Sequence, residues 1–371
     1  MSESLQEVFA KNSQESRAVV QTRLPRVSAE EILDLMQNAS LKELGERAFK
    51  IKKQLHPDNL TTFVVDRNIN YTNICWVDCK FCAFYRHEKD ENAYILSLDE
   101  IDAKIDELIS VGGTQILFQG GVHPKLKIEW YEELVRHISK KYPQITIHGF
   151  SANEIEYISR LSRISLKEVL VRLKDAGLYS IPGAGAEILS DRVRKLIAPK
   201  KLMSAKWLEV HETAHKIGMK STATMMFGTL ENDEDITQHL RVLRELQDRT
   251  GGFRAFICWS FQSSGTALIK EFPQIKKQSP ARYLRILALA RIYLDNFKNI
   301  QSSWVTQGSA IGQLALRFGA NDLGSTMLEE NVVSAAGTSY QMSQNEMIRL
   351  IRELGLKPAK RNTNYDILEK F

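Results

Sequence analysis

Cysteine is scarce in this chain, with four cysteines among 371 residues. Disulfide-stabilised secreted domains are short and rich in cysteine, so a disulfide framework is not expected here. The chain also lacks any uncharged apolar run that approaches the roughly 18 residues of a membrane span. Its first segment, 1–26, is polar and charged and has no apolar stretch of the secretory-signal type. We therefore expect a soluble, cytoplasmic protein, where thiols stay reduced.

A strong excess of one charge is absent as well. Lysine and arginine total 50 and aspartate and glutamate total 45, which gives a net charge of +5. The basic residues occur as scattered pairs, such as Lys200-Lys201 and Lys276-Lys277, and they form no stripe that could follow a phosphate backbone. No nucleic acid partner is expected.

Three of the four cysteines lie close together, in a Cys-x3-Cys-x2-Cys spacing formed by Cys75, Cys79 and Cys82. Thiolates hold iron–sulfur clusters, and a cubane cluster normally takes four of them. A group of three therefore leaves one iron without a protein ligand, and an open iron can bind a reactant. The group follows a strand-like segment, where a site carried by a loop is expected.

A structural zinc site and a cluster that only transfers electrons are the alternatives for these cysteines. Structural zinc usually has four ligands, often from two Cys-x2-Cys pairs or from histidines at similar spacing. Here His87 lies five residues beyond Cys82, and no second pair follows. An electron-transfer protein would need no pocket for a second cofactor, and the glycine-rich strand ends argue against it. The fourth cysteine, Cys258, lies in the apolar run 255–259 and is expected to be buried in a strand.

The order of the remaining segments predicts a parallel α/β barrel. Short apolar strands alternate with amphipathic helices, and some helices begin with a capping box such as Ser97 with Glu100. Strands are expected at 62–65, 114–118, 145–148, 178–181, 221–226, 255–260, 299–304 and 321–326. About eight βα units follow, so the predicted fold class is an α/β, (β/α)8 TIM-type barrel. An open, partial barrel of six units is the alternative.

Helical extensions are expected on both sides of the barrel. Helix-like patterns precede residue 58, and Ser343 with Glu346 begins another helix near the C-terminus. The expected organisation is an N-terminal helical extension over 1–58, a barrel over 59–335 and a C-terminal helical extension over 336–371 that packs on the barrel.

In such a barrel the working residues lie at the carboxyl ends of the strands. The sequence 119–121, Gln-Gly-Gly, follows the second strand, and its glycines would let the backbone approach a ligand closely. Ser151 follows the third strand, Glu187 the fourth and Gly228 the fifth. A structural role is the alternative at each place: 119–121 as a tight turn, and Ser151 as the cap of the next helix.

The cysteine spacing, with an aromatic residue just before the last cysteine, resembles the signature of the radical S-adenosylmethionine enzymes. In that family the open iron of a [4Fe-4S] cluster chelates the methionine moiety of S-adenosyl-L-methionine, and one electron cleaves the sulfonium to methionine and a 5′-deoxyadenosyl radical.

The resemblance implies both cofactors and a one-electron donor such as flavodoxin or ferredoxin. It assigns the cluster to Cys75, Cys79 and Cys82. It assigns S-adenosylmethionine to Phe81, Gln119, Gly120, Gly121, Ser151, Glu187 and Gly228. The family usually has Gly-Gly-Glu where this chain has Gly120-Gly121-Val122, so only a backbone role is carried over to the glycine pair.

Six segments together narrow the resemblance to the radical enzymes of futalosine-pathway menaquinone biosynthesis and of deazaflavin assembly. They are 75–86, 119–124, 148–155, 181–201, 303–308 and 319–337, and the resemblance covers about residues 60–360. It implies that the radical removes the C4′ hydrogen of the ribose in dehypoxanthine futalosine. The carbon radical would add to the benzoate ring, which would then lose a proton and an electron to give a cyclic product. The members of the subfamily that form aminofutalosine or the deazaflavin are the alternatives.

Substrate contacts are expected mainly near the last two strand ends. The candidates are His123, Gln307, Asn321, Asp322, Ser325 and Thr326. Asn and Asp also favour turns without any ligand. The final proton could go to His123, His148 or Glu187, and the sequence does not choose among them. An arginine for the benzoate carboxylate is chemically sensible, but 50 basic residues offer too many choices.

Overall fold

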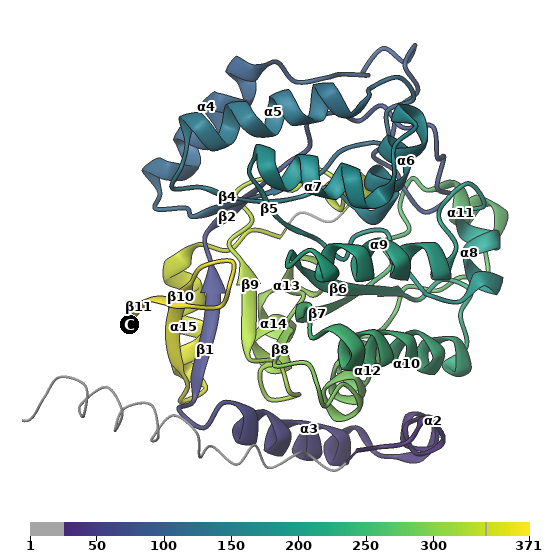
Figure 1. The fold of residues 1–371 in the computed structure, drawn as a ribbon. Coiled ribbons are helices and arrows are strands. Elements are labelled where there is room, and N and C mark those ends of the chain that lie inside the picture. Colours follow the sequence, from purple (N-terminus) through teal and green to yellow (C-terminus); the bar gives the residue numbers. More distant parts are fainter. Residues whose placement is uncertain (1–25, 338–339) are drawn as a thin grey trace, which may run out of the picture.

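The computed structural model describes residues 26–337 and 340–371. Within this part of the chain, a curled sheet of 11 strands runs in the order β11-β10-β1-β9-β8-β7-β6-β5-β4-β3-β2 (Figure 1). The strands are β1 (Leu60–Val64), β2 (Asp66–Ile69), β3 (Gln115–Phe118), β4 (Thr146–Gly149), β5 (Leu178–Ile181), β6 (Lys220–Phe227), β7 (Phe253–Ser260), β8 (Asn299–Gln301), β9 (Asp322–Ser325), β10 (Lys357–Arg361) and β11 (Ile367–Lys370). All neighbouring pairs are parallel except β10 with β11.

The sheet curls because β1 and β2 are consecutive stretches of one extended segment. β1 pairs with β9, through Thr62 opposite Asp322, and β2 pairs with β3, through Asp66 opposite Gln115. The two ends of the parallel sheet therefore meet at residues 60–69. The predicted α/β barrel of TIM type is confirmed, in the partial form that was the alternative to a full (β/α)8 barrel. Its parallel strands converge with their carboxyl ends on one side, where the cysteine-bearing loop begins.

Helices cover the outside of the sheet (Figure 1). They are α2 (Ala29–Asn38), α3 (Leu41–Leu55), α4 (Leu98–Ser110), α5 (Ile128–Lys141), α6 (Ala152–Ser162), α7 (Leu166–Ala176), α8 (Asp191–Ile197), α9 (Ser204–Lys216), α10 (Asp233–Thr250), α11 (Ala267–Glu271), α12 (Pro280–Tyr293), α13 (Trp304–Gln307), α14 (Ser309–Ala315) and α15 (Gln344–Glu353). The capping box of Ser97 and Glu100 forms as predicted at the start of α4. No helix in the described ranges is long and apolar enough to cross a membrane.

The N-terminal extension is helical where the structure describes it. α2 packs on α10 and α12, and α3 packs along α12. Lys52 of α3 is buried there and donates a hydrogen bond to Leu316 O (3.1 Å). The first 25 residues of the predicted 1–58 extension lie outside the described residues.

The C-terminal extension contains α15 as predicted, but it is not helical throughout. β10 and β11 follow α15 and extend the sheet. In the 60–69 segment, β3 pairs with the second half, which is β2. The edge of the first half, β1, is occupied by β10, with Leu60 opposite Lys357. The sequence of β10, Lys-Pro-Ala-Lys-Arg, has no apolar alternation that would predict a strand. This segment is a strand because it pairs with the edge of β1, and strand formation depends strongly on such a partner.

The predicted strand 299–304 is also shorter than expected. β8 ends at Gln301, and Trp304 begins α13. The chain leaves the sheet because the Ser303 N–H donates to the Tyr283 hydroxyl (2.8 Å) instead of to a neighbouring strand. The Trp304 indole then donates to Ser325 O (3.0 Å) and is buried beside β9.

Buried histidines make the stability of this fold depend on pH. His148, His211 and His239 are 8%, 0% and 0% exposed. Burial lowers the pKa of all three, to about 3 for His148 and His239. The unfolded chain titrates near pH 6.5, so below that value it binds protons that the folded protein does not. The free energy of unfolding therefore decreases as the pH falls below about 6.5. The decrease is about 1.4 kcal/mol per histidine for each pH unit.

Urea unfolding at about pH 7.5 and about pH 5.5 checks this expectation. The His239→Gln variant should lose about 1.4 kcal/mol less than the parent protein between the two conditions. Glutamine is a suitable exchange because its carbonyl oxygen can still accept the Leu189 N–H that now bonds to His239 Nδ1 (2.9 Å). His87→Gln, at an exposed histidine, is the matched control. An equal loss in all three proteins would contradict the expectation.

Candidate active site

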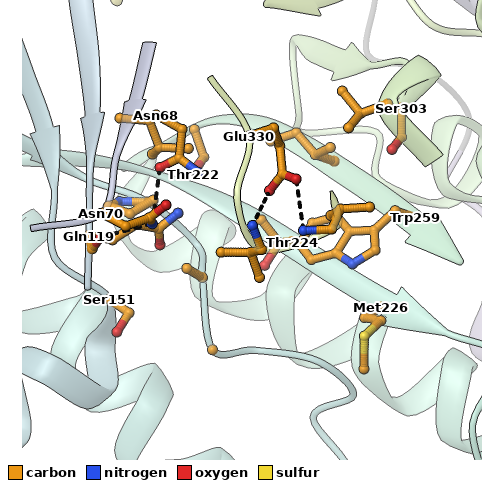
Figure 2. A pocket seen from close by; sticks show the side chains of 18 of the residues that line it. Asn68, Asn70, Gln119, Ser151, Thr222, Thr224, Met226, Trp259, Ser303 and Glu330 are labelled. Carbon is orange, nitrogen blue, oxygen red and sulfur yellow. Dashed lines mark hydrogen bonds between the residues drawn. The ribbon is translucent and has the colours of Figure 1, made fainter. Parts of the chain in front are cut away.

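A cavity of ≈ 440 Å³ fills the interior of the barrel. It extends from the cysteine-bearing loop after β2 to Arg254 at the start of β7 and Arg361 at the end of β10. Figure 2 shows polar side chains from several strands pointing into it. The cavity therefore connects the carboxyl ends of the strands with the floor that the C-terminal strands provide.

The three cysteines are brought together by the loop after β2. Cys75, Cys79 and Cys82 all line the cavity, and Cys79 is the most buried. The Cys75 N–H donates to Arg86 O (3.0 Å), and the Cys82 N–H donates to Cys79 O (3.0 Å). Asp78 has a left-handed backbone, with φ 51°. These features curl the loop so that all three sulfurs face the same space.

The surroundings of the three thiols affect how readily they lose their protons. Burial raises the pKa of all three cysteines, and the ammonium group of Lys201 opposes that rise. A bound metal stabilises thiolates in the same sense. Within the described residues, no group of three or more His, Cys, Asp or Glu side chains is arranged to hold a single metal ion. Three thiolates from one loop are the donor chemistry of an iron–sulfur cluster in which each thiolate binds a different iron.

Lys201 forms a buried ion pair beside the cysteines. Its Nζ lies 2.5 Å from Glu187 Oε1 and 5.0 Å from the centre of the Phe81 ring. Glu187 has a left-handed backbone, with φ 45°, which turns its side chain toward the cavity that it lines. A carboxylate has about four acceptor positions. The predicted contact of Glu187 with S-adenosylmethionine would therefore use the positions that Lys201 leaves free.

The glycine pair after β3 lies directly against the cysteine loop. A Cβ at Gly121 would come within 2.3 Å of Ile74 O, and one at Gly120 would come within 2.8 Å of the Tyr71 ring. The Gly121 N–H donates to Thr72 O (2.8 Å). Both glycines are thus required for close packing of two backbones, and a backbone contact with S-adenosylmethionine stays a prediction.

Ser151 caps α6, which was its structural alternative, and it also lines the cavity. Its partner in the capping box, Glu154, was missed as a site residue. The Glu154 carboxylate accepts hydrogen bonds from the Tyr71 hydroxyl (2.5 Å) and from Gly120 N (3.1 Å). Burial raises the pKa of Glu154. The spacing of Ser151 and Glu154 was the available signal, and their bonds tie the glycine pair to α6.

Six of the seven residues predicted to contact S-adenosylmethionine line the cavity: Phe81, Gln119, Gly120, Gly121, Ser151 and Glu187. The seventh, Gly228, is not among the described lining residues. Its N–H is held by the carboxylate of Glu231, and a Cβ there would meet the Gln278 side chain at 2.4 Å. Gly228 closes a turn at the end of β6, outside the described lining of the cavity.

Only Ser325, of the predicted substrate contacts, is among the described residues that line the cavity. The structure places His123, Gln307, Asn321, Asp322 and Thr326 outside that lining. For Asn321 and Asp322, the reason is that each side chain is held by an arginine from another part of the chain. The Asn321 amide bonds Arg291 Nη2 (2.9 Å) behind the sheet, and Asp322 is held by Arg361.

Of the three candidate proton acceptors, two line the cavity and one does not. His148 and Glu187 line the cavity, whereas His123 does not and instead accepts the Lys125 N–H at Nδ1 (3.2 Å). His148 Nδ1 lies 2.7 Å from Ser180 Oγ. Since burial lowers the pKa of His148 to about 3, its imidazole is neutral near pH 7.

Opposite walls of the cavity differ in polarity (Figure 2). Asn68, Asn70 and Gln119 lie together on one side, where Asn70 Nδ2 donates to Gln119 O (3.1 Å). Trp259 and Met226 lie on another side. The asparagines were missed; Asn68 lies in β2, and Asn70 follows the end of that strand directly, two residues further along. One wall can therefore bind hydroxyls while another holds an apolar ring.

The segment after β9 also contributes to the lining. Glu330 lines the cavity, and its carboxylate accepts hydrogen bonds from the N–H groups of Val332 (3.0 Å) and Val333 (2.7 Å) (Figure 2). Burial raises the pKa of Glu330. Its backbone bonds fold this segment into a turn beside the cavity.

Two family models together match most of the chain. The one described as "Radical SAM superfamily" matches residues 69–243, and the one described as "CofH/MqnC C-terminal region" matches residues 250–371. A cyclic dehypoxanthine futalosine synthase of Streptomyces coelicolor is 46% identical, over 92% of this chain and 86% of the relative. The synthase of the same name from Halalkalibacterium halodurans is 44% identical, over 93% and 92%. An aminodeoxyfutalosine synthase of Thermus thermophilus is 38% identical, over 92% of each chain.

Solved structures share the fold at low identity. Methylornithine synthase matches with a TM-score of 0.70 and 16% identity, over 90% of this chain and 94% of that one. The FeFe-hydrogenase maturase of Carboxydothermus hydrogenoformans matches with a TM-score of 0.71 and 17% identity, over 97% and 82%.

Proposed function

Because the chain belongs to the radical SAM CofH/MqnC family, we propose that it converts dehypoxanthine futalosine to cyclic dehypoxanthine futalosine in menaquinone biosynthesis. One observation carries the proposal. The two relatives named for this product resemble the chain over nearly its whole length, and more closely than the aminodeoxyfutalosine synthase does. A one-electron donor such as flavodoxin or ferredoxin would supply the reducing equivalent.

Cys75, Cys79 and Cys82 would hold a [4Fe-4S] cluster, which together with S-adenosylmethionine supplies a 5′-deoxyadenosyl radical when bound. Phe81, the glycine pair and Glu187 lie beside these cysteines along the cavity. Their part would be to hold the adenosyl and methionine groups against the cluster and to keep water out of the contact.

On the substrate, the C4′ hydrogen is removed and the C4′ radical forms a bond to a carbon of the benzoate ring. The C4′ hydrogen is carried away by the 5′-deoxyadenosyl group as 5′-deoxyadenosine. The ring then loses one proton to a base and one electron to a one-electron acceptor of the flavodoxin or ferredoxin class, so the product has two fewer hydrogens than the substrate. Trp259, Ile257 and Met226 give the ring an apolar wall that excludes water. Asn68 and Ser303 offer hydrogen bonds to ribose hydroxyls.

His148 and Glu187 are the proposed candidates for taking up the ring proton, because both line the cavity. Burial lowers the pKa of His148 to about 3, so its imidazole is a weak base near pH 7.

The proposed function is tested with protein that is purified and reconstituted without oxygen. 5′-Deoxyadenosine is measured with S-adenosylmethionine and a reductant, in the presence and absence of dehypoxanthine futalosine. We expect that the substrate stimulates cleavage and that a product two hydrogens lighter accumulates. The cavity supports this expectation because it has lining side chains near the cysteines and others at the floor. These two groups of side chains can hold the two ends of an extended substrate.

Two other results would redirect the interpretation. Cleavage that does not respond to dehypoxanthine futalosine would exclude the cyclase and favour the aminofutalosine or deazaflavin reaction of the same family. Absence of cleavage from protein with a full complement of iron and sulfide would point to an iron–sulfur electron-transfer protein.

A further inference from the structure

The floor of the cavity carries an arginine whose role nothing so far explains. Arg254 is the second residue of β7 and lines the cavity. Its neighbour Phe253 points outward and stacks on Phe297, with ring centres 5.5 Å apart. Ile257, further along the strand, lines the cavity again. The guanidinium of Arg254 therefore belongs to the inner face of the barrel.

The other charges at the floor are already paired. Arg361, the second arginine among the described lining residues, bonds Asp322 through Nε (2.5 Å) and Nη2 (3.1 Å). Asp66 accepts hydrogen bonds from Gln115 Nε2 (2.7 Å) and from the Ser325 hydroxyl. An anionic ligand that reached this region would thus find the Arg361 guanidinium already paired with Asp322.

Arg254 differs because no ion pair joins it to a carboxylate in the described part of the chain. Its guanidinium lies 5.0 Å from the centre of the Tyr179 ring, and Nη1 lies 3.5 Å from Thr363 O. Asp366 is the nearby carboxylate, and it accepts from Asn362 Nδ2 (2.9 Å). A half-buried cation at the end of a cavity is favourable only with an anion to pair with.

We propose that Arg254 binds the carboxylate of the benzoate group of the substrate. The inference rests on the proposed function, which supplies a substrate with one carboxylate on the ring. The cysteines lie at the carboxyl end of the barrel and Arg254 lies at its amino end. A substrate whose ribose lies near the cysteines extends its aromatic end toward the floor. The planar guanidinium can then form two parallel hydrogen bonds to the carboxylate.

This assignment makes Arg254 a determinant of specificity. A neutral group in place of the carboxylate would leave a desolvated cation without its partner, and that loss exceeds the loss of one ordinary contact. Tyr179 and Thr363 would keep the arginine in place while the cavity is empty.

The test compares substrate and protein variants together. Equilibrium binding of dehypoxanthine futalosine and of its benzamide analogue is measured on the oxygen-free, cofactor-loaded protein without reductant. We expect the amide to bind the parent protein more weakly by on the order of 10- to 100-fold. Arg254→Gln should weaken carboxylate binding by a similar factor and should not distinguish the two ligands. Arg254→Lys should recover part of the preference.

Arg241→Gln is the matched control, because Arg241 is an exposed arginine of α10 that bonds Gln238 and Glu245. Equal binding of acid and amide by the parent protein would overturn the inference, and so would an Arg254→Gln protein that keeps the preference. The parental comparison decides the question even if Arg254→Gln fails to fold. If the parent binds no dehypoxanthine futalosine, the proposed function fails, and the same comparison with benzoate and benzamide then judges Arg254 separately.

Discussion

Replacement of Cys79 by alanine is expected to reduce 5′-deoxyadenosine formation to the background level. Cys79 is the most buried of the three cysteines, and its Sγ shares the cavity with Cys75 and Cys82. Two thiolates cannot supply the three ligands that an open cluster requires. The expected loss should accompany a fall in iron and acid-labile sulfide per chain after reconstitution, which is measured independently of turnover.

Cys258 provides the matched control for this experiment. It is fully buried in β7 and lies outside the cavity lining of the described chain, as the sequence predicted for a core cysteine. Cys258→Ala should keep its iron, its sulfide and its turnover, and should show only the stability cost of a small core cavity, about 1–2 kcal/mol. A Cys79→Ala protein that retained its iron and its turnover would rule out the assigned ligand set.

The second large effect is expected at the ion pair between Arg361 and Asp322. The two side chains are 5% and 0% exposed. Arg361→Met would leave Asp322 as a buried charge without its partner, and breaking a buried pair in this way costs about 3–5 kcal/mol. The Thr62 hydroxyl, which donates to Asp322 at 2.5 Å, compensates only part of that loss. The free energy of unfolding in urea measures the effect.

Arg349→Met separates the effect of burial from the effect of removing an arginine. Arg349 pairs with Glu353 on the surface of α15, where the two side chains are 58% and 47% exposed. A surface pair of this kind contributes about 1 kcal/mol or less. Adding Asp322→Asn to Arg361→Met should restore much of the lost stability, because the uncompensated charge disappears. Equal destabilisation by the two single arginine exchanges would contradict the role given to burial.

Much of the site followed from the sequence because local chemistry specifies it. The spacing of Cys75, Cys79 and Cys82 fixes three sulfurs in one loop whatever surrounds it. Close approach of two backbones requires glycine at 120 and 121, and the capping pattern at Ser151 fixes the start of α6. These features depend on neighbours within a few residues, so the order of residues is enough to place them.

Most of the predicted substrate residues near the last strands lie outside the described lining of the cavity. Asn321 and Asp322 have the polar side chains expected of a strand end, yet both are used in holding Arg291 and Arg361. Position at a strand end does not tell which way a side chain points or which distant cation it meets. Arg254 carries no local signature, and it became visible as a cavity residue only through the curl of the sheet.

The sequence by itself determined the alternation of strands and helices, the cysteine loop and the core role of Cys258, because each depends on periodicity or spacing along the chain. Only the tertiary structure decided that β10 joins β1, that Lys201 meets Glu187, and that Arg254 lies at the cavity floor with no carboxylate ion pair in the described residues. The physical reason is that pairing of edges and charges depends on distances between residues far apart in the chain, and folding alone sets those distances.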